Sequence, residues 1–145
     1  MSIQMKRAII NLVIWLSVFL LFLFVFISGN TVASWGDNRV KTITLASLLG
    51  IGYIGQLILS IVFRKRKNTI NTDERDAMIL NKAMSNSFIV TLVYLFLIAM
   101  SLYLYYEKTG FVPVAWLWFT AYNVVMVANI STSGFLIFQH HRSGN

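Results

Sequence analysis

The residues best suited to chemistry form one short acidic cluster near the middle of the chain. Asp73, Glu74 and Asp76 are three of only five acidic residues, and Arg75 lies among them. Catalysis by such groups needs a nucleophile with a base, or paired carboxylates over a pocket. No histidine is near the cluster in the sequence, and these are the only clustered acids. We therefore expect the protein not to be an enzyme.

Histidine and cysteine are the other residue types that could hold a metal. His140 and His141 are adjacent, so on a helix their side chains would point about 100° apart, which is poor for binding one ion. We interpret them as interfacial polar residues at a helix end. The chain has no cysteine, which excludes disulfides, thiolate metal sites and thiol nucleophiles. We expect no metal and no cofactor.

The chain that forms the secondary structure around these residues is very apolar. Of its 145 residues, 57% are hydrophobic and 12% are charged, whereas a soluble domain has about 25% charged residues. The net charge of +7 would suggest nucleic acid in a soluble protein. Here the basic residues flank apolar runs, so membrane topology and anionic lipid headgroups explain them better, and we expect no direct contact with nucleic acid.

Four apolar segments are long enough to cross a membrane, which takes roughly 20 helical residues. They are residues 8–28, 42–63, 87–106 and 113–138. The first is too long for a signal peptide, whose apolar region has about 7–15 residues. We predict an all-α, integral membrane four-helix bundle in which residues 1–145 form a single membrane domain. Gly110 and Pro113 predict a tight turn that makes the third and fourth helices antiparallel neighbours.

Basic residues predict the orientation through the positive-inside rule. If both termini lie on one side, that side has nine basic residues: Lys6, Arg7, Arg64, Lys65, Arg66, Lys67, Arg75, Lys82 and Arg142. The other side has three: Arg39, Lys41 and Lys108. We therefore predict a multi-pass protein of the cytoplasmic membrane with both termini and the connector 64–86 in the cytoplasm. Arg64, Lys65, Arg66 and Lys67 are expected to contact anionic lipid headgroups.

The acidic cluster also has the pattern of a helix start. Asn71 can cap the helix, and Glu74 can complete a variant of the capping box. The acidic side chains stabilise the helix by about 0.3–1 kcal/mol each through their interaction with the helix dipole. We expect the helix to run from about Thr72 through Tyr106, with its first third extending into the cytoplasm. Spacings of three and four place Asp76, Ile79, Ala83 and Ser87 on one face.

Two interpretations of this segment are compatible. The structural one is that the acids cap a long helix. The functional one is that the segment docks a cytoplasmic partner through a surface drawn from Asp73, Glu74, Arg75, Asp76, Ile79, Lys82 and Ala83.

The signature of this segment resembles that of an uncharacterised family of small bacterial and archaeal membrane proteins. Asp73-Glu74-Arg75, Ile79 and Lys82-Ala83 match a D-E-R-x-x-x-I-x-x-K-A pattern that the family carries between the second and third of its four spans. The resemblance implies no enzymatic activity. It also implies a partnership with a small helix-turn-helix regulator.

Polar residues inside the predicted spans offer a second candidate site. Gln56 lies in the second span, and Asn123, Asn129 and Ser133 lie in the fourth. We expect these two helices to pack closely, with Gln56 bonded to Asn123 or Asn129. The alternative is a small polar site for a ligand or a lipid headgroup.

The function that these patterns favour is a non-enzymatic regulatory or interaction protein. No charged residue or histidine lies within any predicted span, whereas ion-coupled transporters usually have one there. The alternatives are a small transporter, which would have to be a homo-oligomer, or an immunity-type membrane protein.

Overall fold

The computed structural model describes residues 3–28, 31–33, 35, 37, 39–65 and 74–142, without the side chains of Arg64, Lys65 and Arg75. These residues form four helices: α1 (Ile3–Ile27), α2 (Arg39–Lys65), α3 (Glu74–Tyr106) and α4 (Val114–Arg142). All four are long and apolar enough to cross a membrane. The predicted all-α fold with four helices of membrane-spanning length is therefore confirmed for the described part of the chain, which contains no strand.

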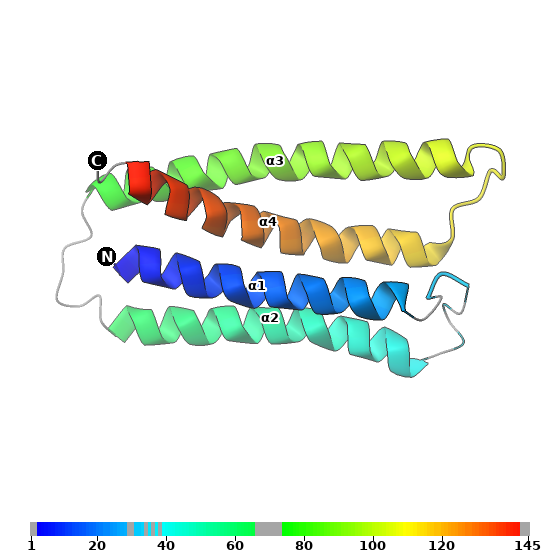
Figure 1. The fold of residues 1–145 in the computed structure, drawn as a ribbon, viewed down its shortest axis with the longest axis horizontal. Coiled ribbons are helices and arrows are strands. Elements are labelled where there is room, and N and C mark those ends of the chain that lie inside the picture. Colours follow the sequence, from blue (N-terminus) through cyan, green and yellow to red (C-terminus); the bar gives the residue numbers. More distant parts are fainter. Residues whose placement is uncertain are drawn as a thin grey trace.

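The helices lie in the order α3, α4, α1, α2 across the molecule (Figure 1). Helix α4 packs between α3 and α1, and α1 packs between α4 and α2. Both termini lie at the end where α1 and α3 begin and where α2 and α4 end. We call this the basic end, because Lys6, Arg7, Lys82 and Arg142 lie there. The other is the opposite end.

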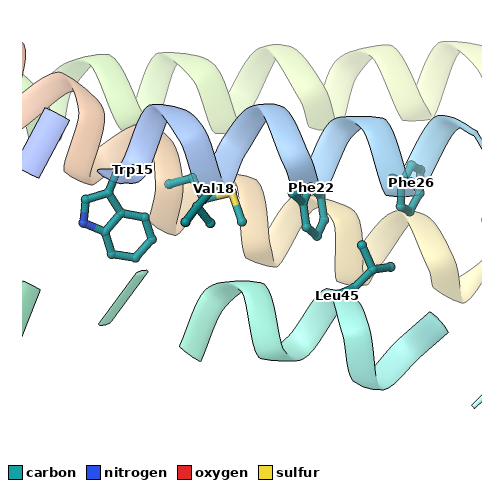
Figure 2. Packing of buried hydrophobic residues seen from close by; sticks show 6 residues of the cluster. Trp15, Val18, Phe22, Phe26 and Leu45 are labelled. Atoms are coloured by element: carbon teal, nitrogen blue, oxygen red, sulfur yellow. The ribbon is translucent and has the colours of Figure 1, made fainter. Parts of the chain in front are cut away.

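The central packing of α1 comes from a stripe of large side chains. Trp15, Val18, Phe22 and Phe26 recur at helical spacing and are all buried. Figure 2 shows this stripe facing Leu45 of α2, and Met126 of α4 completes the same cluster. The Phe26 ring lies 4.6 Å, between centroids, from Phe119 of α4. Such aromatic pairs contribute about 0.5–1.5 kcal/mol beyond the burial of their area.

The expected close packing of α2 with α4 was wrong, because α1 lies between them. The small residues of α2 do permit a close approach, but their neighbour is α1. A Cβ atom on Gly52 would lie 2.9 Å from Cζ3 of Trp15, and one on Gly55 would lie 3.3 Å from Ile14. The large side chains of α1 thus occupy the space that the glycines leave open.

The expected hairpin between α3 and α4 is confirmed. Gly110 has φ of 65°, a left-handed conformation that glycine adopts without strain. Its N–H donates to the carbonyl of Tyr106 at 3.0 Å. Trp116 Nε1 also donates to the Tyr106 hydroxyl at 2.8 Å, which joins the two helices beside the turn.

The edge helices α2 and α3 present much apolar surface. Among the four spans, α1 buries the largest share of its most apolar part and α3 the smallest. Phe96 and Leu97 of α3 are both mostly exposed. Exposing so large an apolar surface to water is unfavourable, so these faces suit the hydrocarbon of a bilayer.

Candidate functional site

The acidic cluster begins α3, although only part of it lies within the described residues. Glu74 is the first residue of the helix and is exposed, and Asp76 is half-buried. Asp73 and the expected cap Asn71 lie outside the described residues. Helix α3 has 33 residues, or about 50 Å at 1.5 Å per residue. That length exceeds the hydrocarbon core, which is about 30 Å thick.

The docking candidates divide between two faces of α3. Ile79 and Ala83 are buried, with 8% and 0% of their surfaces exposed, on the face that α4 covers. Asp76 and Ser87 share this face as expected, since Asp76 is half-buried and Ser87 is buried. Ile79 and Ala83 therefore stabilise the contact between α3 and α4, and a docked protein would not reach them.

The opposite side of the same turns is exposed. We call it the outer face of α3, and it consists of Glu74, Met78, Asn81, Lys82 and Ser85. Its two charged residues are Glu74 and Lys82, and the large apolar side chain of Met78 lies between them in the sequence. The side chain of Arg75 is not among those described.

The basic candidates, residues 64–67, come shortly before the outer face of α3 in the sequence. Arg64 and Lys65 are the last residues of α2, whereas Arg66 and Lys67 lie outside the described residues. Their contact with lipid headgroups stays a prediction.

A second candidate site is a layer of polar side chains in the half of the bundle nearer the basic end. Asn11 Nδ2 of α1 donates to Ser133 Oγ of α4 at 2.8 Å. Ser133 was expected to bond between helices, and it does. The sequence interpretation missed its partner, Asn11, although a lone amide in an otherwise apolar span was a usable signal.

Hydroxyl groups continue this layer from α4 to α3. The Oγ atoms of Ser87 and Ser131 lie 2.7 Å apart, and Thr132 Oγ1 donates to Ser87 Oγ at 2.8 Å. Ser87 in turn donates to the carbonyl of Ala128 at 2.9 Å. These bonds hold the first part of α3 against α4. From the sequence, Ser87 was expected only to lie on the same face of the helix as Asp76, Ile79 and Ala83.

The three amides of the predicted α2–α4 contact do not pair with one another. Asn123 donates to the carbonyl of Phe119 at 2.8 Å, and Asn129 donates to that of Val125 at 2.9 Å, both within α4. Gln56 Oε1 is buried and has no partner among the described residues. The expected pairing was wrong because α1 separates Gln56 from α4.

Gln56 belongs instead to a polar seam between α1 and α2. Arg7 Nη2 donates to Ser60 Oγ at 2.8 Å across this contact. We call Arg7, Asn11, Trp15, Gln56 and Ser60 the α1–α2 polar seam. Three of its buried atoms have no hydrogen-bond partner among the described residues: Asn11 Oδ1, Trp15 Nε1 and Gln56 Oε1. A buried polar atom left unpaired costs about 1–3 kcal/mol.

A hollow of about 270 Å³ lies at the opposite end of the molecule. Its lining consists of six apolar or aromatic side chains and one threonine: Leu23, Phe26, Ile27, Thr31, Val32, Trp116 and Phe119. The Thr31 hydroxyl is already bonded to the Phe26 carbonyl at 2.8 Å. This hollow offers apolar contact and no acid, base or nucleophile.

The histidines lie in the last turn of α4. His140 Nε2 is buried without a partner among the described residues, and His141 is exposed. Within the described part of the chain, no three His, Cys, Asp or Glu residues are grouped so that they could hold a metal ion.

Comparisons with protein-family models, curated proteins and solved structures give no significant match to this chain. The family resemblance based on the segment 73–83 therefore stays a prediction.

Proposed function

We propose that this is a non-enzymatic, multi-pass protein of the cell membrane that docks a soluble cytoplasmic protein on the outer face of α3. The observation that carries the proposal is the two-sided character of the first turns of α3. Ile79 and Ala83 are buried on one side, while Glu74, Met78 and Lys82 are exposed on the other. A helix held on one side by its own protein is a rigid surface on which another protein can bind.

The length of α3 supports its extension beyond the membrane. The 25 residues from Lys82 to Tyr106 measure about 37 Å along a helix, which is enough for the hydrocarbon core. The 8 residues from Glu74 to Asn81 add about 12 Å. That extra part would lie at the headgroups and in the water beyond them.

The distribution of basic residues supports a cytoplasmic position for this part. Nine of the twelve Lys and Arg residues lie near the two termini or within residues 64–86. By the positive-inside rule, the basic end would face the cytoplasm. The outer face of α3 lies at this end.

The chemistry of the outer face indicates the kind of partner. Glu74 and Lys82 carry opposite charges about 12 Å apart along the helix, and Met78 lies between them in the sequence and is 72% exposed. Methionine side chains adapt well to the surfaces of protein partners. The partner would place an apolar pocket over Met78, a basic group near Glu74 and an acidic group near Lys82. A small helix-turn-helix regulator, which the family resemblance implies, is one candidate.

Site-specific crosslinking in native membranes tests this proposal. Because the chain has no cysteine, Met78→Cys and Met100→Cys each provide one attachment point for a photocrosslinker. Met100 is a matched control, since it is exposed on the same helix but lies within the apolar span. The proposal predicts a soluble protein bound at position 78 and none at position 100.

Charge reversal makes the test specific. Glu74→Lys should reduce the crosslinked product at least about tenfold, since like charges at an interface cost several kcal/mol and each 1.4 kcal/mol is a factor of about ten. Glu107→Lys, at the other end of α3, is the matched control and should leave it unchanged. A product equally strong at both positions, or one insensitive to Glu74→Lys, would contradict docking on this face.

A homo-oligomeric transporter is the second candidate, and the polar layer is the observation that favours it. Asn11, Ser133 and Ser87 place polar groups inside the apolar spans of three helices. In that case substitution of Asn11 or Gln56 would change the flux of a solute, while Glu74→Lys would have little effect. A flux assay in proteoliposomes distinguishes the two functions.

A further inference from the structure

The residues that carry the three unpaired atoms of the α1–α2 polar seam lie within about one helical turn of one another in depth. Arg7 contacts Ser60, and Trp15 lies against Gly52. Asn11 is four residues from both Arg7 and Trp15, and Gln56 is four residues from both Ser60 and Gly52. Because four residues are about one helical turn, Asn11 and Gln56 lie at the same level between these two contacts.

The orientation of Trp15 brings its polar atom toward that level. In Figure 2 the indole nitrogen lies on the side of the ring away from Val18, toward the beginning of α1. Asn11 is the next residue of the seam in that direction. Trp15 is fully buried, so its N–H has no bulk solvent to bind.

The three atoms have the chemistry of a water site. Trp15 Nε1 can only donate, whereas Asn11 Oδ1 and Gln56 Oε1 can only accept. A water molecule has two hydrogens to donate and lone pairs to accept, and buried waters typically make about three such bonds. One donor and two acceptors therefore match one water molecule.

The exposed part of the seam lies at the basic end. Arg7 and Ser60 lie at that end of the seam, and Arg7 is exposed. The three unpaired atoms are covered in this conformation, so α2 must move outward before water can bind. Because α2 is an edge helix that packs mainly along α1, such a movement leaves the packing of α1, α4 and α3 on one another in place.

We propose that the α1–α2 polar seam binds water within the membrane, with water bridging Asn11 Oδ1, Trp15 Nε1 and Gln56 Oε1 and entering past Arg7 and Ser60. The site reaches Trp15, eight residues from Arg7, or about 12 Å along α1. The proposal is independent of docking on α3, since it involves other helices.

Thiol labelling tests the proposal directly, because the natural chain contributes no cysteine. Gln56→Cys places a thiol in the seam from α2, and Asn11→Cys places one there from α1. If one of the two variants does not fold, the other still tests the proposal. Leu57→Cys is the matched control for depth, since Leu57 adjoins Gln56 but is 62% exposed on the surface of the bundle. The probe is a charged, membrane-impermeant methanethiosulfonate, applied to each side of sealed vesicles.

A further control addresses the space that truncation creates. Asn123→Cys shortens an amide in α4 whose Oδ1 is also buried and unpaired, but Asn123 lies outside the seam. If truncation alone admitted water, this thiol would react as well.

We expect both seam thiols to react from the basic end at least about tenfold faster than the thiols of Leu57→Cys and Asn123→Cys. A thiol in hydrocarbon stays protonated, and the charged probe does not enter the hydrocarbon. Seam thiols that react no faster than these two controls would overturn the proposal. Equally fast reaction of the Leu57 control or the Asn123 control would also overturn it, since the probe would then reach thiols that lie outside the seam.

Discussion

Replacing Gly52 with alanine tests the close contact that places α2 against α1. A Cβ atom at this position would lie 2.9 Å from Cζ3 and 3.0 Å from Cη2 of Trp15. Trp15 is fully buried, so its ring has little space to move. We expect the two helices to separate slightly, or the ring to leave its preferred rotamer.

The magnitude follows from comparison with Gly50, which has nothing within 4 Å of an added Cβ. Gly50→Ala changes the intrinsic helix propensity in the same way, by up to about 1 kcal/mol in favour of alanine. The difference between the two variants therefore isolates the overlap with Trp15. Overpacking of a filled core costs about 1–3 kcal/mol, so Gly52→Ala should be less stable than Gly50→Ala by that amount.

Reversible unfolding of the purified protein in mixed detergent micelles measures this difference. The free energies of unfolding of both variants would be compared with that of the natural chain. Equal stability of Gly52→Ala and Gly50→Ala would refute the contact between Trp15 and α2, and with it the register of the α1–α2 polar seam.

Three more predictions concern stability and use the same unfolding measurement. Ser133→Ala should cost about 0.6–2 kcal/mol, because it removes the bond to Asn11 between α1 and α4; no cost in an Asn11→Ala background would confirm that the two residues act together. Phe22→Ala should cost about 3–5 kcal/mol because its ring is buried, whereas Phe24→Ala, at a position 70% exposed, should cost much less; equal costs would contradict the placement of α1. Trp116→Phe should cost about 0.5–1.5 kcal/mol through the lost hydrogen bond to the tyrosine that ends α3, and an unchanged stability would contradict that bond.

The helices and one of their contacts could be predicted from the sequence because those features depend on local patterns. Apolar length alone indicates each span. The α3–α4 hairpin follows from Gly110, whose left-handed conformation ends α3 a few residues before α4 begins. The face formed by Ile79 and Ala83 follows from helical spacing, and both residues are buried as that spacing requires.

The choice of neighbours could not be predicted in the same way. Gly52 and Gly55 indicate that some helix approaches α2 closely, but they do not say which one. The contact between Trp15 and Gly52 identifies that helix as α1. Any large side chain of another helix would have been compatible with the same glycines.

The candidate site was predicted only in part for a related reason. Ser133 was predicted to be an interhelical polar residue. Its partner Asn11 lies in the first predicted span, which was recognised as apolar and uncharged, and its polar residues were not considered as bonding partners. The seam itself depends on the register of α1 against α2, as the pairing of Arg7 with Ser60 shows. Register is a property of the packed pair and is not visible in either helix alone.

The central claim is that four helices cross the membrane with the basic end in the cytoplasm, so that the outer face of α3 meets soluble proteins. Reporter tags placed at the C-terminus, in the connector between α2 and α3, and in the α3–α4 turn at Thr109 measure this directly. We predict that the first two tags are cytoplasmic and that the third is external. A connector tag accessible from outside intact cells would contradict the orientation and remove the basis for docking on α3.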